Sequence, residues 1–144
     1  LGFCLGLAPI AASVIVLNSI HIYSVILCLG VMFWTAGFDL LYALQDMEYD
    51  KKAGLYSIPA KFGKKTTFFI SALFHFLAVA FWLLFAWVSG LGIVAYAGIF
   101  VSAGILFAEH RIVRKNFAQI DKAFFTLNGY LSIIFFIFIW VDVL

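Results

Sequence analysis

The sequence is poor in charge, in proline and in cysteine. Only 11% of its 144 residues are charged, whereas soluble domains carry about 25%. Residues 1–38, 66–108 and 123–141 contain no Asp, Glu, Lys or Arg. This composition excludes a disordered chain and a nucleic-acid-binding protein, because both need abundant charge. The two cysteines, Cys4 and Cys28, stand in apolar runs, so a disulfide scaffold is excluded as well.

Long apolar runs take the place of charge, and 66% of the residues are hydrophobic. A transmembrane helix needs about 20 mostly apolar residues, so the three uncharged stretches have room for two, two and one such helices. The runs are continuous rather than alternating, which favours helices over a β-barrel. We therefore predict an all-α, polytopic transmembrane helix bundle of about five spans, at residues 2–17, 22–43, 67–88, 92–108 and 124–143.

The basic residues predict the orientation of these spans. All nine fall in two connecting segments, and two spans separate the segments, so both emerge on the same side: Lys51, Lys52, Lys61, Lys64 and Lys65 in the first, and Arg111, Arg114, Lys115 and Lys122 in the second. An excess of Lys and Arg marks the cytoplasmic side of a membrane protein. We predict an integral protein of the bacterial inner membrane with both charged loops in the cytoplasm.

Several local features carry separate predictions. Gly2-x-x-x-Gly6 predicts close packing of the first span against a neighbour, and Pro9 interrupts that span. Gly54 is interpreted as a helix C-cap, and residues 57–59, Ser-Ile-Pro, as a stop and turn. The aromatic side chains Phe33 and Trp34 are interpreted first as packing residues, and the histidines are assigned no role: His21, His75 and His110.

An acidic segment follows the second span. If the helix continues through it, Asp39, Asp46 and Asp50 lie on one stripe together with Tyr42, at about 100° per residue. Like charges at this spacing destabilise a helix, so a cation is expected to neutralise them. Mg²⁺ typically takes one or two carboxylates with substrate phosphates and waters. The stripe is thus interpreted as a site for Mg²⁺ and a phosphorylated ligand; the alternative is a solvated helix end beside the membrane.

The spacing of this segment resembles the second aspartate-rich motif of the UbiA family of membrane prenyltransferases, most closely its 4-hydroxybenzoate polyprenyltransferase branch. The residues that carry the resemblance are Asp39, Tyr42, Ala43, Asp46, Asp50, Gly54 and Ser57, followed by Phe62 and Gly63. Two further stretches are similar to the fifth and the ninth span of the family: residues 1–9, and Lys122, Ala123 and Phe124 with Asn128.

The resemblance implies a fold of nine spans around a cavity, in which two aspartate-rich motifs hold Mg²⁺ and a prenyl diphosphate. The first motif is absent, so residues 1–144 correspond to spans five to nine, the C-terminal portion of a single domain, and are expected to be inactive alone. Asp46, Asp50 and Asp39 are expected to ligate the metal. Asp39 and Tyr42 are the candidate catalytic residues. Lys51 and Lys52 beside them either hold the diphosphate or contact anionic lipid.

The function implied is Mg²⁺-dependent transfer of a polyprenyl group from its diphosphate to an aromatic acid such as 4-hydroxybenzoate, in ubiquinone biosynthesis. The first alternative is a different aromatic acceptor, such as a precursor of menaquinone. The second is an ion-coupled transporter with Asp39 as its ion site. Transport sites lie near the middle of the bilayer, whereas these carboxylates gather at one end of a span, so the enzyme is favoured.

Overall fold

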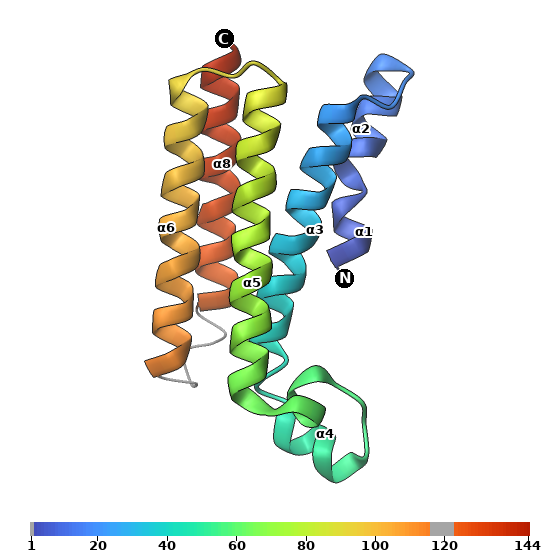
Figure 1. The fold of residues 1–144 in the computed structure, drawn as a ribbon, viewed down its shortest axis with the longest axis vertical. Coiled ribbons are helices and arrows are strands. Elements are labelled where there is room, and N and C mark those ends of the chain that lie inside the picture. The colour runs from blue at the N-terminus through green and yellow to red at the C-terminus, as the bar shows by residue number, and fades with distance from the viewer. Residues whose placement is uncertain (1, 116–122) are drawn as a thin grey trace.

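The computed structural model describes residues 2–115 and 123–144, and these residues form helices and turns without a strand (Figure 1). The predicted all-α fold is confirmed. Lys122 lies outside the described residues. The elements are α1 (Gly2–Gly6), α2 (Ala8–Leu17), α3 (Ile22–Tyr42), α4 (Met47–Ala53), α5 (Ile58–Val88), α6 (Ile93–Lys115), the π-helix η2 (Ala123–Leu127) and α8 (Asn128–Val143).

Four helices are long and apolar enough to cross a membrane: Ile22–Tyr42, Ile58–Val88, Ile93–Lys115 and Phe125–Val143. The remaining predicted span is a shorter apolar segment, Gly2–Leu17, which breaks at Leu7 into α1 and α2. The break lies just before Pro9, which occupies the first turn of α2. The predicted interruption by Pro9 is confirmed, because proline is accommodated at a helix start but not inside a helix.

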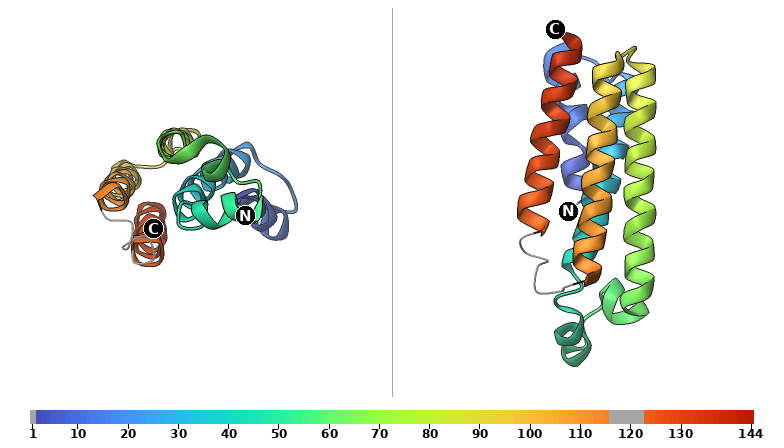
Figure 2. Two further views of the ribbon diagram at one scale, coloured as in Figure 1. Left: turned by 90° about the horizontal axis from the view of Figure 1, so that it is seen from below. Right: turned by 90° about the vertical axis from the view of Figure 1, so that its left-hand side faces the viewer.

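The long helices alternate in direction and form an arc (Figures 1 and 2). Helices α3 and α6 run toward the end of the molecule that carries α4, and α5 and α8 run away from it. The two basic segments that the structure describes therefore share one end, as predicted. They are helical rather than loops, because α4, the first turns of α5 and the last turns of α6 contain them. In particular α6 continues to Lys115, well past the predicted end at residue 108.

Close approach of α1 to α3 depends on the two glycines of the first span. A Cβ atom added to Gly2 would lie 2.8 Å from the carbonyl oxygen of Met32, and one added to Gly6 would lie 3.0 Å from that of Cys28. Both glycines are buried. The predicted packing role of Gly2-x-x-x-Gly6 is confirmed.

The contact of α3 with α5 is built in the same way. A Cβ atom on Gly30 would lie 2.6 Å from the Trp82 ring, and one on Gly37 would overlap the His75 ring more closely still. The Ser71 hydroxyl donates to the Gly37 carbonyl oxygen at 2.6 Å. Two glycines of α3 thus create the space that two large side chains of α5 occupy.

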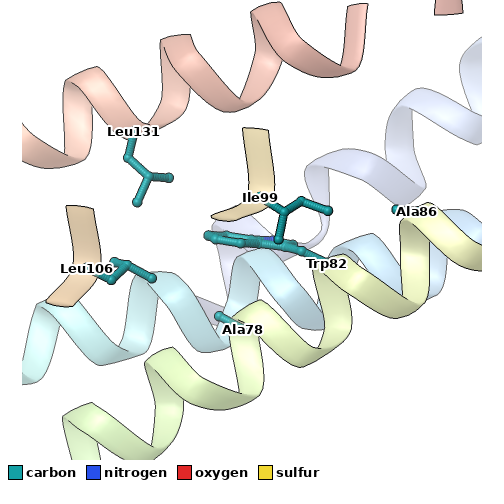
Figure 3. Packing of buried hydrophobic residues seen from close by; sticks show 6 residues of the cluster. All are labelled: Ala78, Trp82, Ala86, Ile99, Leu106 and Leu131. Atoms are coloured by element: carbon teal, nitrogen blue, oxygen red, sulfur yellow. The ribbon is translucent and has the colours of Figure 1, made fainter. Parts of the chain in front are cut away.

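Trp82 stands at the centre of the main apolar cluster, which joins α5, α6 and α8 (Figure 3). It is 1% exposed, and Ile99, Leu106 and Leu131 surround it from the neighbouring helices. At the far end of the bundle, Asp142 of α8 accepts hydrogen bonds from the backbone N–H groups of Gly92 and Ala95 and thereby caps α6. The sequence did not indicate this cap, because its donor and acceptor residues are far apart in the chain.

Substitution Gly37→Ala is expected to lower the free energy of unfolding by about 2 kcal/mol, because the new methyl group forces the His75 ring out of its place. Unfolding of the full-length protein in mixed micelles measures the change. Gly104→Ala in α6 is the matched control, since no heavy atom lies within 4 Å of its added Cβ. Equal stability of the two variants would contradict the packing role of Gly37.

Candidate functional site

The helix that carries Asp39 does not continue through the acidic segment, so the predicted single stripe is wrong. Helix α3 ends at Tyr42, and α4 begins at Met47 with Asp46 as its N-cap residue. The charges of α4 agree with the helix dipole, which favours carboxylates in the first turn of a helix and basic residues in its last turn, although Asp39 stays in the last turn of α3. The break gives Glu48 and Asp50 the first turn of α4 and leaves Lys51 for its last turn.

Helix α4 ends at Gly54, whose backbone lies in the left-handed region at φ 67°, so the predicted C-cap is confirmed. Residues 57–59 start a helix, and the predicted stop is wrong. The Ser57 hydroxyl accepts a hydrogen bond from the Ala60 N–H at 3.2 Å, and Pro59 stands in the first turn of α5, where its missing N–H costs nothing. A kink at Gly63, with φ 76° and ψ 171°, separates this first turn from the apolar body of α5.

Asp39, Asp46 and Asp50 lie at the α4 end of the molecule and have no charged partner in the part of the chain that the structure describes. Asp39 and Asp50 are half-buried and Asp46 is exposed. Within residues 2–115 and 123–144, the one ion pair joins Lys51 to Glu48 at 3.3 Å. No side chain of these residues donates a hydrogen bond to the three aspartates. Carboxylates left unpaired beside several lysines are available to a cation.

A hollow of about 350 Å³ lies between α4 and the start of α5. Asp50, Lys51 and Lys61 provide its charged groups, and the rest of its wall comes from the intervening turn: Gly54, Leu55, Tyr56 and Ala60. The structure thus brings together Asp50 and Lys51 among the predicted site residues. It adds Lys61, and it leaves Lys52 exposed on α4 outside the wall.

The aspartate carboxylates supply oxygen atoms of the kind that Mg²⁺ prefers, but other ligands would have to complete the site. Among the residues that the structure describes, no three His, Cys, Asp or Glu side chains converge as a metal site. Mg²⁺ does not need a complete protein cage, because it binds through one or two carboxylates and retains waters and substrate phosphates. Asp46 is the N-cap residue of α4 and Asp50 lies in its first turn, so both carboxylates belong to the start of that helix. Two carboxylates are the number that Mg²⁺ typically takes from a protein, so the residue types present are compatible with the ion.

Tyr42 and Phe33 are packing residues in this structure. Tyr42 is half-buried against the cluster of Leu41, Leu44, Phe68 and Val113. Phe33 stacks on Phe81 with the ring centroids 5.7 Å apart, and it meets Phe74 edge-on at 5.5 Å. The packing interpretation of Phe33 agrees with these contacts.

Trp34 belongs to a buried network of hydrogen bonds that the sequence analysis did not predict. Its indole N–H donates to the Asn128 side-chain oxygen at 3.0 Å, and the Asn128 amide donates to Glu109 Oε1 at 3.0 Å. Glu109 is 2% exposed, and its Oε2 atom has no partner among the described residues. This hydrogen-bond network joins α3, α8 and α6. The available signal was Glu109 itself, an acidic residue that directly follows an uncharged stretch.

A second buried polar contact joins α5 to α6. The imidazoles of His75 and His110 share a hydrogen bond of 3.1 Å, with the ring centroids 5.0 Å apart. The sequence assigned neither histidine a role, because no histidine pairs with a cysteine or a carboxylate at metal-ligand spacing. The structure assigns both to the helix–helix contact.

Comparisons with known proteins agree with the fold and with the family resemblance of the sequence. A family model described as the UbiA prenyltransferase family matches residues 1–140. A 4-hydroxybenzoate octaprenyltransferase of Shewanella woodyi is 32% identical over 112 residues, which are 77% of this chain and 38% of that protein. One from Salmonella newport is 24% identical over 137 residues, 95% of this chain and 47% of that protein.

A solved structure is similar as well. The apo structure of a UbiA homolog from Aeropyrum pernix K1 matches with a TM-score of 0.80 and 29% sequence identity, over 99% of this chain and 54% of that one. The chain therefore spans about half the length of that protein and less than half the length of the curated relatives it matches.

Proposed function

This chain belongs to the UbiA prenyltransferase family, and from that premise we propose that the protein it forms part of transfers a polyprenyl group from a polyprenyl diphosphate to an aromatic acid. Residues 1–144 are then the C-terminal portion of a single membrane domain, its spans five to nine. The first aspartate-rich motif belongs to the other part of that domain, so the chain alone is expected to be inactive.

The observation that carries the proposal is that the three aspartates have no ion-pair partner among the described residues. Asp39 is half-buried at the end of an apolar helix, where an ionised carboxylate is costly without a partner. Among the described residues Asp46 and Asp50 have no ion-pair partner, although Lys51 and Lys52 are their neighbours. A structural role would favour ion pairs here, whereas a ligand site needs the carboxylate oxygens free.

In the proposed reaction Asp46 and Asp50 hold Mg²⁺, with Asp39 as a third candidate ligand. The bound ion supplies charge neutralisation on the diphosphate as it leaves. Lys51 and Lys61, in the wall of the hollow beside Asp50, bind diphosphate oxygens as point charges. Lys52 lies outside that wall, so we assign it a weaker, longer-range attraction to the diphosphate.

Asp39 lies deeper in the apolar body than the other carboxylates. It is the first charged residue after the uncharged part of α3, so it stands between the region that suits an isoprenoid chain and the charged end. At this position its carboxylate either ligates the metal or orients the phenol of the acceptor and accepts its proton. Tyr42, one turn further along α3, is the second candidate catalytic residue, and its ring packs against the cluster of Leu41, Leu44, Phe68 and Val113.

For the acceptor we propose 4-hydroxybenzoate, and with it a step in ubiquinone biosynthesis. The support comes from the names of the curated relatives and from the aspartate motif. An aromatic precursor of menaquinone is the alternative acceptor. The positively charged end of the bundle, with α4 and the last turn of α6, is assigned to the cytoplasm of a bacterial inner membrane.

One assay tests the proposal. Full-length protein in membranes receives a polyprenyl diphosphate, Mg²⁺ and either 4-hydroxybenzoate or a naphthoic acid, and the products are identified by mass. We expect the prenylated 4-hydroxybenzoate. If only the naphthoic acid is prenylated, the acceptor is a menaquinone precursor instead. If neither acid is prenylated, the proposed transfer reaction is wrong.

A further inference from the structure

A groove of about 550 Å³ lies between α5 and α6, away from the aspartates. Its walls come from residues 68–79 of α5 and 103–114 of α6, and Phe76 and Phe107 stand exposed at its rim. The groove is lined by apolar side chains except for His75 and His110 and for two arginines at one end. We call it the α5/α6 groove.

The charged end of the groove carries two arginines. The Arg111 guanidinium lies 5.8 Å from the centre of the Phe107 ring, and the Arg114 guanidinium lies 6.0 Å from that of Phe68. Both rings line the groove. The cation–π contacts therefore hold both positive charges over its mouth. Neither guanidinium has a carboxylate within 4.0 Å among residues 2–115 and 123–144.

From Phe68 to Val79 helix α5 advances about 16 Å, at about 1.5 Å per residue. One leaflet of a bilayer contributes about 15 Å of hydrocarbon. The groove is thus about as long as one leaflet is thick, and its arginines belong to the last turns of α6, at the end of the bundle that carries α4 (Figure 1).

We propose that the α5/α6 groove is a binding site for an anionic phospholipid, with one acyl chain along its apolar walls and the phosphate between Arg111 and Arg114. An exposed apolar groove on a membrane protein meets lipid chains rather than water. The pair of unneutralised guanidinium groups at its end selects a headgroup with net negative charge. This occupant does not depend on the proposed transfer reaction.

The test uses full-length protein in mild detergent and native mass spectrometry with added phosphatidylglycerol or phosphatidylcholine. We expect tight binding of one phosphatidylglycerol. The double variant Arg111→Gln, Arg114→Gln is expected to weaken it about thirtyfold, since two basic residues near a membrane surface together contribute about 2 kcal/mol. Lys65→Gln with Lys115→Gln is the charge-matched control, because both lysines are exposed at the same end outside the groove.

A second pair of variants tests the apolar part. Ala72→Leu fills the groove wall, whereas Ala80→Leu adds the same bulk at an exposed position of α5 outside it. We expect only Ala72→Leu to reduce binding. Equal affinity for both lipids, or unchanged binding in the arginine variant, would overturn the proposal. Displacement of phosphatidylglycerol from the groove by a polyprenyl diphosphate at lower concentration would show that the occupant is the isoprenoid instead.

Discussion

Asp46→Asn and Asp50→Asn are each expected to lower turnover of the full-length enzyme by about 10²-fold or more, comparable with the loss of one transition-state contact in other active sites. Each substitution removes the negative charge of one of these two aspartates. Among the described residues no basic side chain forms an ion pair with either of them. The diphosphate would then leave with its developing charge incompletely neutralised. Turnover measured across a range of Mg²⁺ concentrations checks the prediction, and the Mg²⁺ requirement should rise in both variants.

Glu48→Gln is the matched control for these aspartates. It removes one negative charge from the same helix, but its carboxylate already pairs with Lys51 on an exposed surface. Such pairs contribute little, so turnover should stay within about twofold of the parent protein. Direct binding of Mn²⁺, followed by its magnetic resonance signal, separates metal loss from misfolding. Normal turnover and normal Mn²⁺ binding in both aspartate variants would refute the assigned metal ligands.

Asn128→Leu is expected to lower the free energy of unfolding by about 3 kcal/mol. The substitution leaves the Trp34 N–H and the Glu109 carboxyl group buried without their bonds, and each stranded polar group costs about 1–3 kcal/mol. Unfolding in mixed micelles measures the effect. Tyr130→Leu, an exposed change on the same helix, should alter stability much less.

An exchange of partners tests whether the cost comes from the hydrogen bonds. Asn128→Asp alone faces Glu109 with a second carboxyl group and should destabilise the protein. The double variant Asn128→Asp, Glu109→Gln restores an amide that donates to a carboxyl oxygen and should recover much of the stability. If the double variant is no more stable than the single one, the bonds between α3, α6 and α8 do not contribute as proposed.

The fold could be predicted to the level of spans and their direction, because these depend on local composition. Uncharged stretches of the required length indicated the apolar helices, and the grouping of basic residues indicated which connections share an end. The boundaries were less accurate. Helix α6 extends through Glu109 and Arg114, since a helix can carry charged residues beyond the membrane core, and the shortest span, Gly2–Leu17, is two helices.

The candidate site could be predicted in its residues but not in its shape. The spacing of Asp39, Asp46 and Asp50 identified the motif, yet their assumed helix is broken between Tyr42 and Met47. Helical periodicity describes a face only while the helix continues. A new helix that begins at Met47 places Glu48 and Asp50 in a first turn, where the helix dipole favours carboxylates, and the spacing of residue pairs does not report this.

The sequence by itself determined that the chain is a bundle of apolar helices, that its charges gather at one end, and that it carries an aspartate motif of the UbiA family. These properties follow from residue type and local spacing. Only the tertiary structure decided which side chains meet across helices. It joined Trp34 to Asn128 and Glu109, placed His75 beside Gly37, and set Arg111 and Arg114 at the end of the α5/α6 groove. Such contacts depend on how helices pack, because residues far apart in the chain share them.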